Sequence, residues 1–187
     1  RNNVSFADSV KTEISAHAKG AYHYFPKKCT IIDIGGQDTK IIKIDAKGKT
    51  IGFKMNRKCA AGTGTFLEEI AYKLNIPLEN FNRIALKSSI DTSLSSFCTV
   101  FASTEILTRI KEGEKIEDMV KSAFESVARR VIEMDTLDNT IIMTGGVVAH
   151  NTIISKILSN HIGKKIFLPP EPQLCGAIGA ALFAKDI

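Results

Sequence analysis

The sequence predicts an α/β fold, and three observations carry that prediction. Short apolar runs typical of buried strands alternate with apolar stripes at helical spacing along the chain of 187 residues. Two of the strand-like runs, at 30–34 and 140–143, lead into paired glycines. The composition is 44% hydrophobic, which is enough to build a packed core.

The first part of the chain reads as one helix followed by three strands. Residues 5–8 resemble a capping box, and apolar residues at helical spacing after them predict a helix that ends near Gly20. The predicted strands lie at 30–34, 40–45 and 51–55. The first two should pair as a hairpin, and a Lys47-Gly48 turn should precede the third.

After residue 58 the predicted elements are mainly helices. Helical spacing begins at Ala60 and stops before Pro77. The further predictions are helices at 102–111, 116–134, 153–158 and 174–182, a buried strand at 140–143 and a short strand at 165–168.

Charge and hydropathy exclude several classes of partner. Lys and Arg number 25 against 20 Asp and Glu, but the positive charges are scattered and form no coherent basic stripe, so we expect no nucleic-acid partner. No apolar run approaches the ~18 residues that a bilayer span needs, so we expect no membrane partner. The polar start lacks the apolar segment of a signal peptide, and we therefore expect a cytoplasmic protein.

The first glycine pair has the pattern of a phosphate-binding turn. Asp33 lies within an apolar strand, and Gly35 and Gly36 follow at its end. Backbone without side chains can approach phosphate oxygens closely, and a carboxylate can hold Mg²⁺ or its waters. We expect Gly35, Gly36 and Gln37 to contact the phosphates of ATP or ADP, with Asp33 and Gln37 in catalytic roles.

The second glycine pair has the pattern of an adenosine-binding turn. Gly145 and Gly146 follow the strand at 140–143 and open a helix, and Val147 comes next. A later helix start, at 172–181, is rich in small residues and contains Gln173 and Gly176. We expect Gly145, Gly146, Val147, Gln173 and Gly176 to contact the nucleotide. Each signal alone is weak, because a glycine pair usually marks only a turn.

The order of these three elements resembles the actin-like ATPase and sugar-kinase superfamily. A sharper resemblance lies at 56–68, 96–102 and 15–21, which look like the corresponding segments of the 2-hydroxyacyl-CoA dehydratase activators and their relatives, the ATPase subunits of benzoyl-CoA reductase. The resemblance implies an actin-like ATPase fold of the ribonuclease H-like kind. It also implies a homodimer that holds one [4Fe–4S] cluster between two subunits, with Cys59 and Cys98 as iron ligands.

The positions of the cysteines are compatible with iron ligation by Cys59 and Cys98, but they do not require it. Four cysteines, at 29, 59, 98 and 175, form no Cys-x-x-Cys pair. Cys59 and Cys98 are expected near helix starts at 60 and 102, where the helix dipole favours thiolates. The alternative is that both are buried packing residues, and this is our interpretation of Cys29 and Cys175.

The resemblance also predicts how the chain divides. The family begins with a further phosphate-binding motif, to which nothing here corresponds, so we expect a fragment that binds nucleotide with little turnover alone. Residues 1–58 would complete a first ATPase half-domain with the second phosphate loop. Residues 59–187 would carry the cluster segments and a second half-domain with the adenosine loop.

Three functions remain open from the sequence. The favoured one is an ATP-dependent activator that transfers electrons to an acyl-CoA dehydratase or aryl-CoA reductase, with reduced ferredoxin or flavodoxin as the donor. The alternatives are an actin-like small-molecule kinase, which would not need Cys59 or Cys98, and a nucleotide-binding regulatory module that does not hydrolyse ATP.

Overall fold

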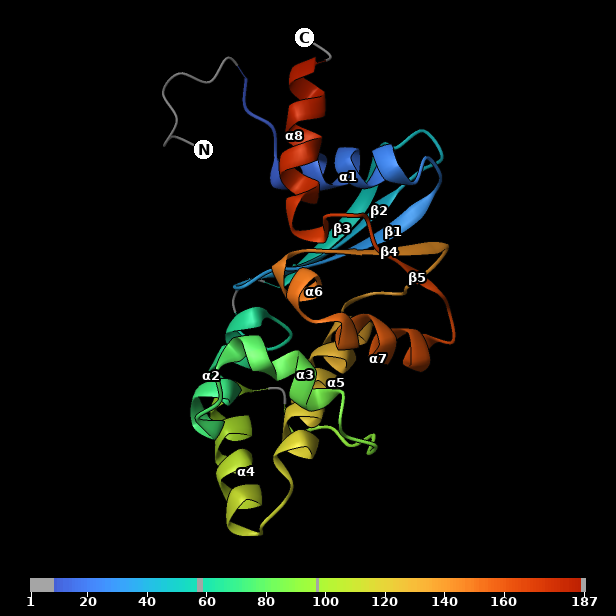
Figure 1. Ribbon diagram of the computed structural model, residues 1–187. Coiled ribbons are helices and arrows are strands. Elements are labelled where there is room, and N and C mark those ends of the chain that lie inside the picture. Colours follow the sequence, from blue (N-terminus) through green and yellow to red (C-terminus); the bar gives the residue numbers. More distant parts are fainter. Residues whose placement is uncertain (1–8, 57–58, 97, 186–187) are drawn as a thin grey trace.

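A five-stranded mixed sheet in the order β3-β2-β1-β4-β5 forms the centre of the molecule (Figure 1). This computed structural model describes residues 9–56, 59–96 and 98–185, and the predicted capping box at 5–8 lies outside them. β1 (Cys29–Ile34), β2 (Thr39–Ile44) and β3 (Thr50–Asn56) pair antiparallel in succession. β4 (Thr140–Thr144) and β5 (Ile166–Phe167) add in parallel on the other side of β1. All five predicted strands are confirmed.

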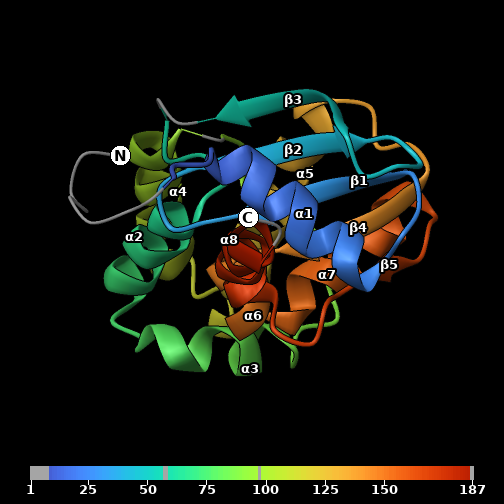
Figure 2. The same cartoon turned by 90° about the horizontal axis from the view of Figure 1, so that it is seen from above.

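The sheet is covered on both faces, because its central strands alternate between two apolar cores. Ile31 and Ile42 face a core shared with α1 (Glu13–Tyr24) and α8 (Cys175–Lys185). Ile32 and Ile41 face a larger core. That core is shared with α5 (Ile116–Met134), α6 (Gly146–His150) and α7 (Thr152–Ile162). In Figure 2, which looks down on the molecule, α1 and α8 lie in front of the strands and α5 and α7 lie behind them.

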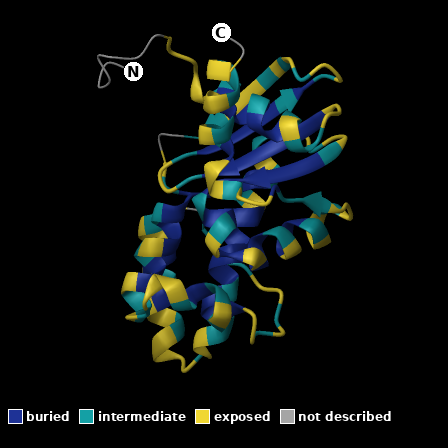
Figure 3. Ribbon diagram, turned by 45° about the horizontal axis from the view of Figure 1, so that its top comes forward, coloured by how far each residue is buried: buried dark blue, intermediate teal, exposed yellow. Residues whose placement is uncertain are grey.

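A helical lobe is inserted between β3 and β4. It contains α2 (Gly64–Leu74), η1 (Leu78–Asn80), α3 (Phe81–Ala85), α4 (Thr99–Lys111) and the start of α5. Phe66, Phe81 and Phe124 are fully buried in this lobe and join the larger core of the sheet. Burial is continuous from sheet to lobe, while the far end of α4 is largely exposed (Figure 3). The lobe and the sheet therefore share one core.

The sheet contains strands from both of the expected half-domains, residues 1–58 and residues 59–187. Strands from both sides of the boundary between them, β1 before it and β4 after it, pair directly over residues 29–33 and 140–144. The division into two half-domains stays a prediction, and strands of one hydrogen-bonded sheet stand on both sides of its boundary. The reason is that a parallel strand can join β1 after a long connection, and here the helical lobe is that connection.

The helix expected to end at Gly20 continues to Tyr24, so that prediction is wrong. Gly20 lies where α1 crosses α8, and a Cβ at this position would overlap the carbonyl oxygen of Cys175. Gly179 on α8 is equally close to the carbonyl oxygen of Ala16. These glycines permit a close crossing of the two helices. In the sequence, a glycine with this packing role cannot be distinguished from a glycine that ends a helix. Among the described residues, none of the helices is long and apolar enough to cross a membrane.

Candidate nucleotide-binding site

The two glycine turns lie side by side at one edge of the sheet. β1 and β4 are parallel neighbours, and Asp33 pairs in register with Thr144. The turns that follow these strands, at 35–36 and 145–146, therefore leave the sheet together, as the carboxyl ends of parallel strands do. The Thr144 hydroxyl donates to Asp33 Oδ1 at 2.9 Å across the 111 positions that separate them.

Gly145 and Gly146 have different roles in the second turn. Gly145 has a φ of 100°, and a Cβ there would overlap the carbonyl oxygen of Ile34. Its N–H donates to the carbonyl of Pro172 at 3.0 Å, so Gly145 joins β1 to the segment before α8. A Cβ on Gly146 would meet only Gln173, with its nearest atom 3.7 Å away. Gly145 is thus required by the backbone conformation and its close contact with Ile34, whereas Gly146 leaves space beside Gln173.

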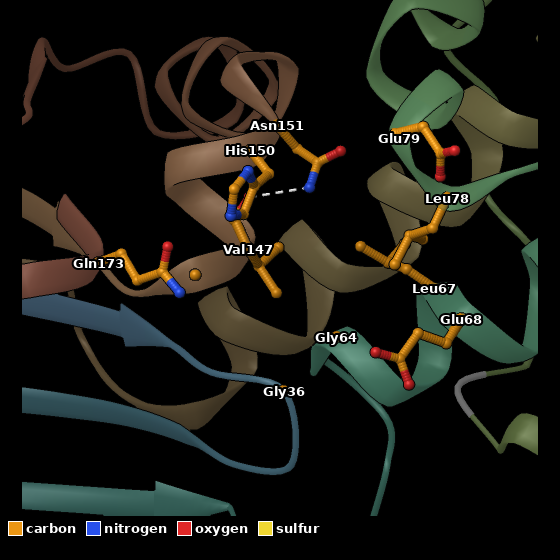
Figure 4. Close-up of a pocket in the computed structure, with 11 residues that line it drawn as sticks. Gly36, Gly64, Leu67, Glu68, Leu78, Glu79, Val147, His150, Asn151 and Gln173 are labelled. Atoms are coloured by element: carbon orange, nitrogen blue, oxygen red, sulfur yellow. Dashed lines mark hydrogen bonds between the residues drawn. The ribbon is translucent and has the colours of Figure 1, made fainter. Parts of the chain in front are cut away.

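The turns form one end of a cleft of about 510 Å³, a volume within the roughly 300–1,000 Å³ of typical ligand sites. Of the predicted nucleotide contacts, the structure brings together Gly36, Gly146, Val147 and Gln173. Figure 4 shows Gln173, Val147 and His150 on one side of the cleft, opposite Leu67, Leu78, Glu68 and Glu79. Gly36 lies at the floor between them.

Seven residues of the cleft were not predicted from the sequence, and most of them lie on the wall opposite Gln173. The missed residues are Gly64, Leu67, Glu68, Leu78, Glu79, His150 and Asn151. His150 and Asn151 lie one turn beyond Gly146, so extending the glycine motif along its helix would have found them. Leu78 and Glu79 come from η1, and no local pattern in the sequence connects that segment with the glycine turns.

The cleft has a polarity that suits a nucleotide. Glycine backbone lines its floor, the apolar side chains of Leu67, Leu78 and Val147 line its middle, and two exposed carboxylates, Glu68 and Glu79, stand on its rim. Phosphates can approach bare backbone closely. Carboxylates repel phosphates but accept hydrogen bonds from hydroxyl and amino groups. The arrangement therefore favours phosphates at Gly36 and the sugar and base toward the rim.

The phosphate turn is hydrogen-bonded directly to the start of α2. The N–H of Gly64 donates to the carbonyl of Gly35 at 2.9 Å, and the N–H of Thr65 donates to that of Gly36 at 2.7 Å. The Thr65 hydroxyl donates to the same Gly36 oxygen at 2.7 Å. A Cβ on Gly64 would lie only 3.0 Å from the Gly36 Cα, so the close contact requires glycine at position 64. Three hydrogen bonds therefore hold the phosphate turn to the first turn of α2.

The remaining predicted contacts lie beside the cleft without lining it. Gly35 donates its N–H to the carbonyl of Asp38 at 2.9 Å and shapes the turn. Gln37 is exposed at the tip of the same turn. Gly176 accommodates the imidazole of His17, because a Cβ there would lie 2.9 Å from His17 Nε2. Nucleotide contact stays a prediction for all of the predicted residues, those that line the cleft included.

Asp33 and Lys40 are the buried members of a charge cluster behind the turn. The Asp33 side chain is 4% exposed, and Asp33 Oδ2 lies 3.4 Å from the ammonium of Lys40. Lys40 Nζ also contacts Asp38 Oδ1 at 2.5 Å and Glu13 Oε1 at 3.0 Å. Burial alone would lower the pKa of Lys40, but its hydrogen bonds to Asp38 and Glu13 and the charge of Asp33 raise that pKa above its ordinary value.

The donor set around Asp33 is compatible with a divalent cation. Among the described residues, Glu13, His17 and Asp33 form the group whose ligand atoms all lie within 4.8 Å of one another. The Lys40 ammonium contacts two of the three, so it supplies a positive charge at the place where a cation would bind. A magnesium role for Asp33 therefore stays a prediction, and it requires rearrangement of these contacts.

Two of the cysteines are packing residues. Cys29 and Cys175 are buried at 1% and 0% exposure in the core between the sheet and α8. Burial raises the pKa of the Cys29 thiol to about 11, against the opposing charge of Lys27. Burial, with a contribution from Asp33, raises the pKa of Cys175 to about 12. Both thiols are therefore protonated at neutral pH and poor metal ligands, which agrees with the packing role expected from the sequence.

Cys59 and Cys98 are exposed, which excludes the alternative that they are buried packing residues. Cys98 is the N-cap residue of α4, so it lies closer to that helix than the predicted start at 102 implied. Cys59 is farther from its helix than expected, since α2 begins at Gly64. Residue 62 is a glycine with a φ of 81°, and this left-handed residue keeps the segment 60–63 as a turn.

The fold and the cleft define a nucleotide-binding unit of the actin-like ATPase class. The protein MreB5 of Spiroplasma citri bound to AMPPNP has this fold, with a TM-score of 0.57 at 20% identity, over 94% of this chain and 59% of that chain. The ethanolamine utilization protein EutJ from Carboxydothermus hydrogenoformans shares it with a TM-score of 0.55, over 90% of this chain and 54% of that chain.

Within that class, the chain belongs to the BadF/BadG/BcrA/BcrD ATPase family, which it matches over residues 1–184. It is 42% identical to the 2-hydroxyisocaproyl-CoA dehydratase activator of Clostridioides difficile, over 100% of this chain and 71% of that protein. It is 39% identical to the (R)-2-hydroxyglutaryl-CoA dehydratase activating ATPase of Acidaminococcus fermentans, over 98% of this chain and 72% of that protein.

A solved relative carries a nucleotide. The structure of the activator of the 2-hydroxyisocaproyl-CoA dehydratase from Clostridium difficile with bound ADPNP matches this fold with a TM-score of 0.92. The match covers 100% of this chain and 70% of that chain at 42% identity. The family and actin-like fold expected from the sequence are thereby confirmed.

Proposed function

We propose that this chain is the nucleotide-binding unit of an ATP-driven activator. In this proposal the activator transfers electrons through a [4Fe–4S] cluster to a 2-hydroxyacyl-CoA dehydratase or a benzoyl-CoA reductase. Reduced ferredoxin or flavodoxin would be the electron donor. Support for the partner comes from the relatives, several of which are named as dehydratase activators and one as part of the benzoyl-CoA reductase of Thauera aromatica.

The single observation that carries the proposal is the link between the phosphate turn and α2. Gly35 and Gly36 form hydrogen bonds with Gly64 and Thr65, and Cys59 lies five residues before Gly64 on the same segment. Binding or loss of a phosphate at the turn changes what its carbonyls and N–H groups contact. Because the carbonyls are bonded to the first turn of α2, we expect that change to reach α2, and the segment of Cys59 precedes this helix.

The residues present fit an iron–sulfur cluster in three respects. Cys59 and Cys98 are exposed, whereas Cys29 and Cys175 are buried with raised pKa values. Cys98 lies at the N-terminus of α4, where the helix dipole stabilises a thiolate. α2 and α4 pack against each other within the helical lobe, and the two cysteines precede these helices, Cys98 directly and Cys59 by five residues.

Two thiolates per chain cannot complete a site that needs four. A second copy related by a twofold axis supplies the other two, so the proposal includes a homodimer. The cluster would supply one-electron redox chemistry at that axis. Within each chain, the glycine turns hold the nucleotide and Asp33 is the candidate that orients Mg²⁺ or water near its phosphates.

The cysteine assignment is tested by iron analysis of the protein expressed from the full open reading frame and purified without air. We expect about four irons per dimer, as a Cys₄ site requires. Cys59→Ser and Cys98→Ser should each lose the iron and the brown colour. Cys29→Ser is the matched control, because it changes a buried thiol and should retain the iron.

The outcomes separate the alternatives. Four irons per monomer would rule out a cluster shared between two chains. Iron retained by Cys98→Ser would remove that residue as a ligand. ATP binding without any iron in the wild type would instead support a regulatory nucleotide-binding module.

A further inference from the structure

The three backbone carbonyls that follow Cys59 all accept hydrogen bonds from side chains, each at 2.6 Å. The donors to the carbonyls of residues 60, 61 and 62 are, in that order, the Thr63 hydroxyl, the Asn56 amide and the Thr39 hydroxyl. Backbone carbonyls of an irregular turn need such partners when they are buried. Thr63 lies within the turn, whereas Asn56 and Thr39 belong to the sheet. The sheet therefore holds two of the three carbonyls.

Thr39 and Asn56 are direct neighbours across two strands. β2 begins at Thr39, β3 ends at Asn56, and the two residues are partners in the antiparallel register. Side chains opposite each other in this way start from Cβ atoms about 4.5–5.5 Å apart. They bond successive carbonyls of the turn, those of Gly62 and Ala61. We call Thr39 and Asn56 the strand-end pair.

Burial encloses the turn on both sides. Thr39 is fully buried and Gly62 is also buried, so loss of the Thr39 hydroxyl would leave the Gly62 carbonyl without a donor and shielded from water. On the other side, the stem of Arg130 from α5 packs on Gly62, since a Cβ there would lie 2.8 Å from Arg130 Cγ. The turn is thus held between the strand-end pair and α5.

We propose that Thr39 and Asn56 are positioning residues, which fix Cys59 relative to the end of the sheet through the turn that follows it. The inference rests on the proposed function, in which Cys59 is an iron ligand. Within a single chain the Cys59 side chain is exposed, so its place depends on the backbone to which it is attached. Hydrogen bonds around a metal site commonly orient its ligands, and their loss weakens metal binding.

A second buried threonine makes the same kind of bond at the opposite end of the sheet. Thr30 is fully buried in β1, and its hydroxyl donates to the carbonyl of Asp138 at 2.8 Å. Thr30 lies at the start of β1, whereas Thr39 pairs with Ile34 at the end of that strand. Thr30→Val and Thr39→Val therefore remove equivalent bonds. Comparing them separates the positioning of Cys59 from a general loss of stability.

The test uses the protein expressed from the full open reading frame and purified without air. Two rates are measured, the removal of iron by a chelator and the amide hydrogen exchange of residues 60–65. Thr39→Val should raise both rates about fivefold, a factor typical of one hydrogen bond. Asn56→Ala should act in the same direction, and it is the second variant if Thr39→Val does not fold, because Asn56 is only half-buried. Thr39→Ser keeps the hydroxyl and should retain the wild-type rates.

The matched control, Thr30→Val, should lower the melting temperature but leave both rates as they are in the wild type. Iron that leaves Thr39→Val and Asn56→Ala at the wild-type rate would overturn the inference alone, because Cys59 would then not depend on the strand-end pair. Equal acceleration by Thr30→Val would overturn it in favour of a general loss of stability. A wild type that contains no iron would instead refute the proposed function, and the role of the pair with it.

Discussion

Gly146→Val separates nucleotide binding from folding. A Cβ on Gly146 meets only Gln173, at 3.7 Å, so the substitution has room in the absence of nucleotide. The branched side chain would then occupy the space at the glycine end of the cleft that a nucleotide needs. We expect the nucleotide dissociation constant to rise at least tenfold, which corresponds to about 1.4 kcal/mol.

Thermal shift with and without nucleotide provides the measurement. A ligand at 100 times its dissociation constant stabilises the native state by about 2.7 kcal/mol, and after a tenfold loss of affinity by about 1.4 kcal/mol. For a chain of this size 1 kcal/mol corresponds to about 2–4 °C. The nucleotide-dependent shift should therefore fall to about half, while the melting temperature without nucleotide changes little.

Gly145→Ala is the contrasting variant. Gly145 has a φ of 100°, and a Cβ there would overlap the carbonyl oxygen of Ile34. It should lose stability with or without nucleotide, because left-handed strain alone costs about 1–3 kcal/mol. An unchanged nucleotide shift in a folded Gly146→Val protein would refute the assignment of this turn to the nucleotide.

Two further predictions concern buried charge and pH. Lys40→Met leaves Asp33 without its ammonium partner and should cost about 3 kcal/mol in urea unfolding, and adding Asp33→Asn should recover part of this loss. Equal stability of the single and double variants would contradict the pairing. In the pH prediction, the Cys29 pKa is raised from 9.0 to about 11. Burial of the protonated Cys29 thiol therefore contributes its full share to the free energy of unfolding below pH 9. Between pH 9 and pH 11 this contribution, about 2–3 kcal/mol, is lost. The Cys29→Ala variant should lose less free energy of unfolding than the wild type between pH 9 and pH 11. An identical loss in the variant and the wild type would contradict this prediction.

The strands and long helices could be predicted because each is encoded locally. The helix at 116–134 was predicted with the bounds that the structure has, since its apolar residues recur at helical spacing for five turns. The five strands are short apolar runs bounded by turn residues. The glycine turns were identified for the same reason, and Gly36 and Gly146 line the cleft.

The features that could not be predicted depend on distant contacts. Gly20 has the sequence signature of a helix end, and only the crossing with α8 explains why the helix continues. The sheet joins β1 to β4 across the expected boundary at residue 58, a pairing that periodicity within either segment does not encode. α3 (Phe81–Ala85) is too short for helical spacing to reveal it.

The crossing of α1 and α8 has a consequence for the order in which the chain folds. His17 and Cys175 touch across 158 positions, where the Cys175 thiol donates to the His17 carbonyl at 3.8 Å. During synthesis α1, β1 and β2 emerge long before α8, so the apolar face of Cys29, Ile31 and Ile42 lacks part of its cover until then. Contacts this distant in sequence slow folding. A nascent chain would therefore expose this face to chaperones until α8 closes over it.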